Sequence, residues 1–180
     1  MTFTKDLCTA LESLLWCAVS RLGVVGPYFF EESGETVTVT SNRYCEMFEN
    51  FLRAILEEFD DSEDFWFQKD GGTAHTARRS LGILREMFQS RLISLRGDIG
   101  WPARSPDLTP CDFFFLWGYL KAEVYKHRPQ TLKALKDAIP EGLAAIPPEI
   151  TNILMENFRE RLRQCIANNG RHLNDVIFKT

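Results

Sequence analysis

Two aspartates, Asp70 and Asp112, stand where carboxylates could take part in chemistry. Asp70 follows the apolar segment 65–68 and precedes two glycines. In α/β sheets, ligand-handling side chains gather at the carboxyl ends of strands, because the core no longer covers them there. The position therefore predicts a functional carboxylate. The alternative is that Asp70 only begins a turn ahead of the glycines.

Asp112 follows Pro110 and therefore lies in the first turn of the next predicted helix. The helix dipole stabilises a carboxylate at that place, which by itself explains an acid there. A functional role requires Asp112 to lie beside Asp70, since Mg²⁺ prefers carboxylate oxygens. Two such ions, about 4 Å apart, can stabilise the attacking and leaving oxygens of a phosphodiester. Asp107 is a competing acid, with closure of its own turn as the plainer role.

The elements that must position these acids begin with strands. Two apolar runs, 14–20 and 24–30, flank a short turn that contains Gly23, which predicts a buried hairpin. The Thr/Val alternation of 36–40 favours a short strand after a turn at Gly34. The other predicted strands cover 65–68, 91–95 and 176–178.

Helices are predicted between and after the strands. Apolar residues recur at spacings of three and four behind Ser41, which we expect to cap a long helix. Thr131 is expected to cap another helix, and Pro140 to kink or end it. Pro147-Pro148 opens the last helix, which Gly170 ends. The remaining helices are expected at 74–88 and 112–125, and the loop 96–111 lies between them. The order indicates a mixed α/β fold with a helical C-terminal part.

The composition excludes several classes of protein. The chain has 180 residues, 44% of them hydrophobic and 26% charged, which is ordinary for one globular domain. No apolar stretch approaches the roughly 20 residues of a membrane helix, so we expect no membrane partner. The N-terminus is not typical of a secretory signal. Five cysteines without a Cys-x-x-Cys pair indicate a reduced, intracellular setting rather than a disulfide scaffold.

Charge is divided unevenly along the chain. Residues 1–70 carry 14 acids against 5 bases, and residues 71–180 carry 11 acids against 16 bases. The basic part could face a polyanion, with Arg85 and Arg91 among the residues lining a DNA path. Trp101 could stack on a base or on a partner subunit, or it could anchor its loop by packing. The alternative for the arginines is an ordinary solvated surface.

Several motifs resemble those of the mariner-like transposases. The segment 67–77, FQKDGGTAHTA, resembles the motif around their second catalytic acid. The segment 105–112, SPDLTPCD, is similar to the motif that ends in their third acid. The 41 residues between the two aspartates resemble one of the longer separations in this superfamily. The resemblance extends over about residues 14–178 and includes Trp16-Cys17-Ala18, Gly26–Phe30, Leu116–Lys121 and Ile146–Glu149.

The resemblance implies a ribonuclease H-like fold, a mixed sheet flanked by helices. In that family three acids bind two Mg²⁺ or Mn²⁺ ions and water attacks a DNA phosphodiester. The freed 3′-hydroxyl then attacks target DNA. Asp70 and Asp112 correspond to the second and third acids, each as a metal ligand. The implied partners are transposon-end and target DNA and a second copy of the chain, and the implied compartment is the nucleus.

The family's first acid lies on a central first strand, upstream of the Trp16-Cys17 motif. We therefore expect residues 14–180 to form an incomplete catalytic domain behind an atypical segment, 1–13, and to lack DNA cleavage activity. The alternative is that Met1–Thr4, which alternates like a strand, and the following Asp6 replace the missing parts. A second alternative for function is a catalytically dead module that binds DNA or dimerises.

Overall fold

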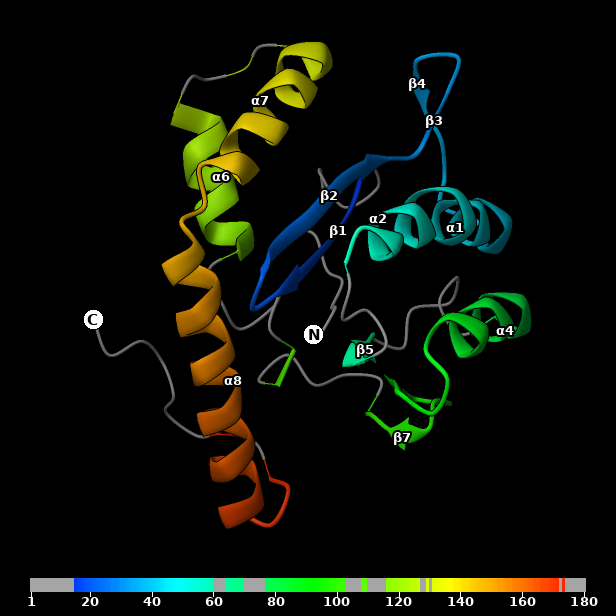
Figure 1. Cartoon of the computed structure of the whole chain (residues 1–180). Helices are drawn as coiled ribbons and strands as arrows, with labels where there is room; N and C mark the ends of the chain where they lie inside the picture. Colours follow the sequence, from blue (N-terminus) through cyan, green and yellow to red (C-terminus); the bar gives the residue numbers. More distant parts are fainter. Residues whose placement is uncertain are drawn as a thin grey trace.

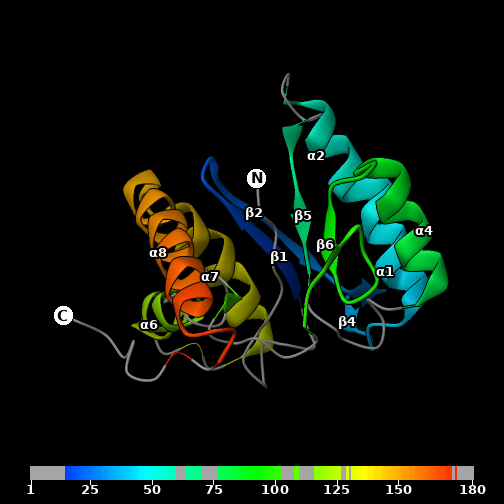
Figure 2. The same cartoon turned by 90° about the horizontal axis from the view of Figure 1, so that it is seen from below.

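Strands occupy the middle of the molecule and helices cover them on two sides (Figures 1 and 2). The structure is a computed structural model that describes residues 15–59, 64–69, 77–102, 108–109, 116–126, 129, 131–171 and 173. The helices between residues 41 and 87 lie on one side of the strands, and those between residues 116 and 167 lie on the other. The predicted mixed α/β architecture with a helical C-terminal part is confirmed.

The predicted hairpin is present as β1 (Leu15–Ser20) and β2 (Gly23–Phe29), paired antiparallel. All six residues of β1 are buried, because both of its faces are covered. Leu15, Cys17 and Val19 pack with the C-terminal helices, whereas the side chains between them pack with the helices on the opposite side. A strand covered on both faces has an apolar run instead of a polar–apolar alternation.

The strand predicted at 36–40 is wrong beyond its first residue. The chain forms a small hairpin instead, β3 (Glu31–Glu32) with β4 (Glu35–Thr36), around the expected turn. The residues after Thr36 lead into the next helix. The Val37 N–H donates to the Phe30 carbonyl at 3.0 Å, and Val37 and Val39 pack on the core. Backbone pairing therefore ends at Val37, and the apolar alternation beyond it reflects side-chain packing.

The long helix predicted behind Ser41 is present in three consecutive parts. These are α1 (Ser41–Met47), a π-helical stretch η1 (Phe48–Leu52) and α2 (Arg53–Glu57). The cap is Thr40, one residue before the predicted Ser41, and its Oγ1 accepts a hydrogen bond from the Arg43 N–H at 3.4 Å. The apolar spacing predicted the helix but did not distinguish the π-helical turn.

Three short parallel strands form the second sheet, in the order β5 (Phe67–Gln68), β6 (Leu92–Ser94) and β7 (Ile99–Gly100). Helix α4 (Arg78–Met87) connects β5 to β6. Strand β7 lies in the segment predicted as loop. Its two residues are both exposed and form no hydrophobic pattern from which a strand could be predicted.

The C-terminal part consists of α6 (Leu116–Lys126), α7 (Leu132–Ala144) and α8 (Pro148–Ala167). The caps at Thr131 and Pro147 are as predicted. The prediction that Pro140 ends its helix is wrong, since α7 continues for four residues beyond it. Pro140 faces solvent, where water can replace the lost backbone hydrogen bond, and the buried Ile139 and Leu143 hold the helix in place.

Gly97, in the turn between β6 and β7, lies against the backbone of β6. A Cβ added there would overlap the Leu92 carbonyl oxygen and lie 2.9 Å from the Ser94 backbone nitrogen. We predict that Gly97→Ala lowers the free energy of unfolding by about 1–3 kcal/mol, because the backbone must move. Urea denaturation followed by circular dichroism measures the change.

Gly100 provides the matched control, since a Cβ there meets no atom within 4 Å. Gly100→Ala is expected to change the free energy of unfolding by less than about 1 kcal/mol. Equal effects of the two substitutions would contradict the assigned packing of the β6–β7 turn.

Candidate catalytic site at the end of β5

The two predicted acids, Asp70 and Asp112, lie outside the described residues, as do Asp6 and Asp107. Their roles as metal ligands and their proximity to each other therefore stay predictions. Within the described ranges, no group of three His, Cys, Asp or Glu side chains could hold a metal ion. The structure instead defines the elements on either side of each acid.

Strand β5 is held firmly up to the residue before Asp70. The Phe67 ring stacks on Phe88 at a centroid distance of 4.9 Å and meets the edge of Phe48 at 5.8 Å. The Phe67 N–H donates to the Arg91 carbonyl, and the Lys69 N–H donates to the Ile93 carbonyl, each at 3.0 Å. Asp70 therefore follows a strand end that is fixed by both ring packing and backbone pairing.

Two buried polar side chains directly precede Asp70. Gln68 is 0% exposed and Lys69 is 1% exposed. A buried lysine or glutamine is uncommon in a core, because the polar group loses its hydration. Both residues belong to the motif that resembles the transposases, but no pattern in the sequence indicates that either is buried.

Helix α6, which begins four residues after Asp112, is fixed against the β1–β2 hairpin and α7. Leu120 and Val124 are buried in the same cluster as Leu15 of β1. Gly142 of α7 permits this close packing, since a Cβ there would lie 3.1 Å from the Leu120 Cδ1.

Strands β1 and β5 belong to separate sheets in the part of the chain that the structure describes. There, β1 pairs with β2, and β5 pairs with β6. In the ribonuclease H-like arrangement the first strand stands between them. Residues 1–14 are outside the described ranges. The replacement of the first strand and the first acid by Met1–Thr4 and Asp6 therefore stays a prediction.

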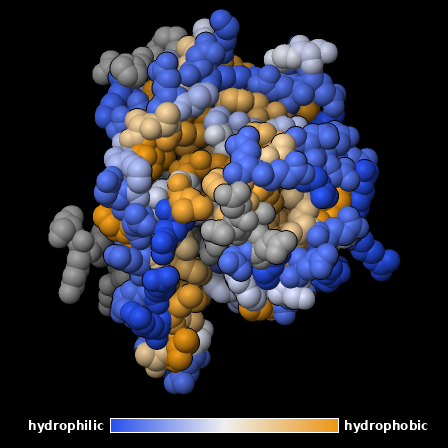
Figure 3. Space-filling model, viewed as in Figure 1, coloured by the Kyte–Doolittle hydropathy of each residue, from blue (hydrophilic) through white to orange (hydrophobic). Residues whose placement is uncertain are grey.

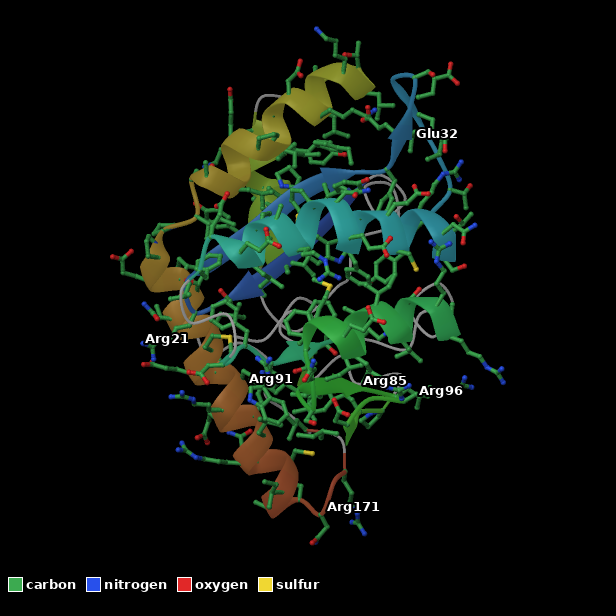
Figure 4. All side chains as sticks on the ribbon, turned by 45° about the vertical axis from the view of Figure 1, so that its right-hand side comes forward. Arg21, Glu32, Arg85, Arg91, Arg96 and Arg171 are labelled. Atoms are coloured by element: carbon green, nitrogen blue, oxygen red, sulfur yellow. The ribbon has the colours of Figure 1, made fainter. Side chains whose placement is uncertain are left out.

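Two of the arginines expected along a DNA path are held by backbone carbonyl groups. The Arg85 Nη2 donates to the Arg96 carbonyl oxygen at 2.8 Å, and the two residues lie side by side in Figure 4. The Arg91 Nη1 donates to the Phe65 carbonyl oxygen at 3.0 Å, which secures the segment leading into β5. These contacts favour a structural role for both side chains.

Trp101 anchors its loop by packing. It is half-buried against the C-terminal helices, with its ring centroid 6.4 Å from that of Phe158. Its backbone N–H donates to the Ser94 carbonyl at 2.9 Å. The sequence left open stacking on a base, stacking on a partner subunit and packing within the loop, and the structure supports packing.

Comparison with known proteins identifies the fold and the relatives of this chain. Models of known protein families give no match. The chain is 31% identical over 138 residues to the Tc3 transposable-element transposase of Caenorhabditis elegans. The aligned region covers 76% of this chain and 39% of that protein. This chain is a homologue of the mariner-like transposases.

Solved structures agree with this relationship. The Mos1 transposase catalytic domain with raltegravir and Mg matches with a TM-score of 0.74 and 22% identity, covering 96% of this chain and 85% of the other. The Mos1 mariner paired-end complex with Mn matches with a TM-score of 0.65 and 24% identity over 88% of this chain and 44% of the other. The expected ribonuclease H-like fold is confirmed. In the described part, no helix of this transposase homologue is long and apolar enough to cross a membrane.

The packing of α6 is testable through Leu120, which is fully buried. We predict that Leu120→Ala lowers the free energy of unfolding by about 2–5 kcal/mol, since it leaves a cavity between α6, α7 and β1. Tyr125→Ala on the same helix, where the side chain is 47% exposed, serves as the control. Its effect should stay within about 0.5 kcal/mol. Urea denaturation of both variants measures the difference, and similar values would mean that α6 is not anchored through Leu120.

Proposed function

We propose that this chain is the catalytic-domain part of a mariner-like transposase that acts on DNA phosphodiesters with divalent cations. The observation that carries the proposal is the 31% identity to a transposase, supported by a fold that matches a transposase catalytic domain over nearly the whole chain. The chain spans 39% of the length of the curated relative it matches. The activity, substrates and partners of the whole protein are therefore part of this proposal.

Asp70 and Asp112 would hold the cation in this proposal. Their carboxylate oxygens are the donors that Mg²⁺ and Mn²⁺ prefer. The strand that leads to Asp70 also carries a buried, unpartnered carboxamide, Gln68, which fits a polar ligand at this strand end. A bound divalent cation lowers the pKa of its water and stabilises negative charge on the phosphate oxygens. The ring packing of β5 and the anchoring of α6 would keep the two carboxylates in place.

We further propose that the chain alone does not cleave DNA. Two-ion chemistry in this family uses three acids, and the sequence matches the family at two of them, Asp70 and Asp112. We predict that the purified chain leaves supercoiled plasmid intact in Mg²⁺ or Mn²⁺, as followed by agarose gel electrophoresis.

Nicking that disappears in both Asp70→Ala and Asp112→Ala would contradict this prediction and establish an active site. In that case the loss of nicking in Asp6→Ala would identify Asp6 as the replacement for the family's first acid. Nicking that persists in Asp70→Ala and Asp112→Ala would indicate a contaminating nuclease.

A second candidate function is a DNA-binding or dimerising module without cleavage activity. Its support is the similarity to Mos1 in a paired-end complex, together with apolar side chains that α8 leaves in contact with solvent. Ile166 is 77% exposed and Ile153 is 45% exposed. Hydrophobic side chains extend along this helix on the face shown in Figure 3. We propose that α8 takes part in contact with a second copy, and that the protein acts in the nucleus, where its DNA substrate is found.

The dimer proposal makes a prediction for Ile166. Ile166→Lys should shift the chain from dimer to monomer in size-exclusion chromatography with light scattering, because a charge would be buried in the contact. Leu22→Lys is the control, since Leu22 is also exposed, at 59%, but lies in the β1–β2 turn. A monomeric wild-type chain at high concentration, or equal behaviour of both variants, would contradict a contact through α8.

A further inference from the structure

Gln68 is a fully buried polar side chain whose two amide atoms have no hydrogen-bond partner. Its exposure is 0%, and both Oε1 and Nε2 are unpaired. A carboxamide that loses its hydration without gaining a partner destabilises the folded chain. Buried polar groups in native proteins are almost always paired, so an exception indicates local strain or an absent ligand.

The surroundings of Gln68 show which side of β5 it occupies. Phe67 packs against Phe48 and Phe88, on the side covered by α1 and α4. Successive side chains of a strand point to opposite faces, so Gln68 lies on the other face of β5, away from this aromatic cluster.

The backbone of Gln68 is directed toward the edge of β5 that is not paired with β6. The N–H groups of Phe67 and Lys69 both donate to β6 carbonyls at 3.0 Å. In a parallel pair, alternate residues direct their N–H and C=O groups to opposite sides, so those of Gln68 point to the other edge. In Figure 2, β6 lies on one side of β5 and β1 lies on the other. The backbone N–H and C=O of Gln68 therefore point toward the region between β5 and β1, and the side chain of the same residue carries the unpaired amide.

We infer that Gln68 is a positioning residue of the cation site, an inference that rests on the proposed function. Its carboxamide acquires its hydrogen-bond partner when a divalent cation with its bound water occupies the carboxylates at the end of β5. Outer-shell hydrogen bonds of this kind orient metal ligands and raise metal affinity. The unpaired amide is then a stability cost that the chain carries in the absence of the cation.

The test measures cation affinity and stability separately in the 180-residue chain. Mn²⁺ is titrated and the free ion is followed by electron paramagnetic resonance, and the melting temperature is recorded without metal. Gln68→Met keeps the length of the side chain and removes the polar atoms. We expect it to weaken Mn²⁺ binding by about 10–100-fold and to raise the melting temperature in the absence of metal.

Ser94→Ala is the matched control, because the Ser94 Oγ is also buried and unpaired. Ser94 shares its face of β6 with Leu92, which belongs to the aromatic cluster, so it lies on the opposite face from Gln68. Ser94→Ala should leave Mn²⁺ affinity within about twofold of the wild type. A loss of affinity in Gln68→Met that Ser94→Ala does not share supports the inference.

Gln68→Glu provides a second test of the role of Gln68 in Mn²⁺ binding if Gln68→Met does not fold. It retains an oxygen on the same carbon skeleton and adds a carboxylate, so it should bind Mn²⁺ more tightly than the wild type. Equal or weaker binding by Gln68→Glu, or unchanged binding by folded Gln68→Met, overturns the inference.

Two further variants separate this inference from the proposed function. Asp70→Asn and Asp112→Asn should each lose Mn²⁺ binding. If both lose Mn²⁺ binding while Gln68→Met binds Mn²⁺ like the wild type, the cation site is supported and the role of Gln68 is overturned. If the wild-type chain itself binds no Mn²⁺, both the cation site and the role of Gln68 are overturned.

Discussion

Burial of both faces of strand β1 is the constraint on which the rest of the structure depends. Its side chains alternate between two hydrophobic clusters, one formed with α1 and α4 and the other with α6, α7 and α8. Trp16 enters the first cluster and Leu15 enters the second, so neighbouring residues of one strand join opposite helical layers. Because a strand has only two faces, this arrangement fixes both layers relative to the hairpin. The helix that follows Asp112 is thus positioned by the same strand that supports the N-terminal core.

The end of β5 combines rigidity with unfavourable burial. Aromatic rings on one side and backbone pairing with β6 hold Phe67 to Lys69, and the buried Gln68 amide within this stretch has no hydrogen-bond partner. A fold selected for stability alone would place apolar side chains there. Function commonly introduces such departures, since catalytic and binding sites need polar groups in positions that destabilise the free protein. Gln68 is the clearest case in the described residues, and it stands two positions before an acid that the sequence predicts to be catalytic.

Ion pairs between the β3–β4 hairpin and the two helical layers contribute less to stability than the hydrophobic clusters. The small hairpin β3–β4 carries two neighbouring acids that pair with different layers, as Glu31 contacts Lys136 of α7 and Glu32 contacts Arg43 of α1. Part of the acidic excess in the first 70 residues is therefore used within the molecule. Partly exposed ion pairs of this kind contribute about 1 kcal/mol each, so they orient the hairpin more than they stabilise the fold.

The sequence by itself determined the order of the elements, the hairpin and the helix caps near Ser41 and at Thr131 and Pro147. These depend on local patterns: apolar runs, spacings of three and four, and residues that accept backbone hydrogen bonds. Its motifs also indicated the transposase relationship that the comparisons support. Tertiary structure decided the continuation of α7 through Pro140, the existence of β7 and the early end of the strand predicted at 36–40. Each of these depends on which side of a segment meets the core or the solvent. The burial of Gln68 was decided in the same way, because a polar letter in a sequence does not reveal whether its amide lies in water or in the interior.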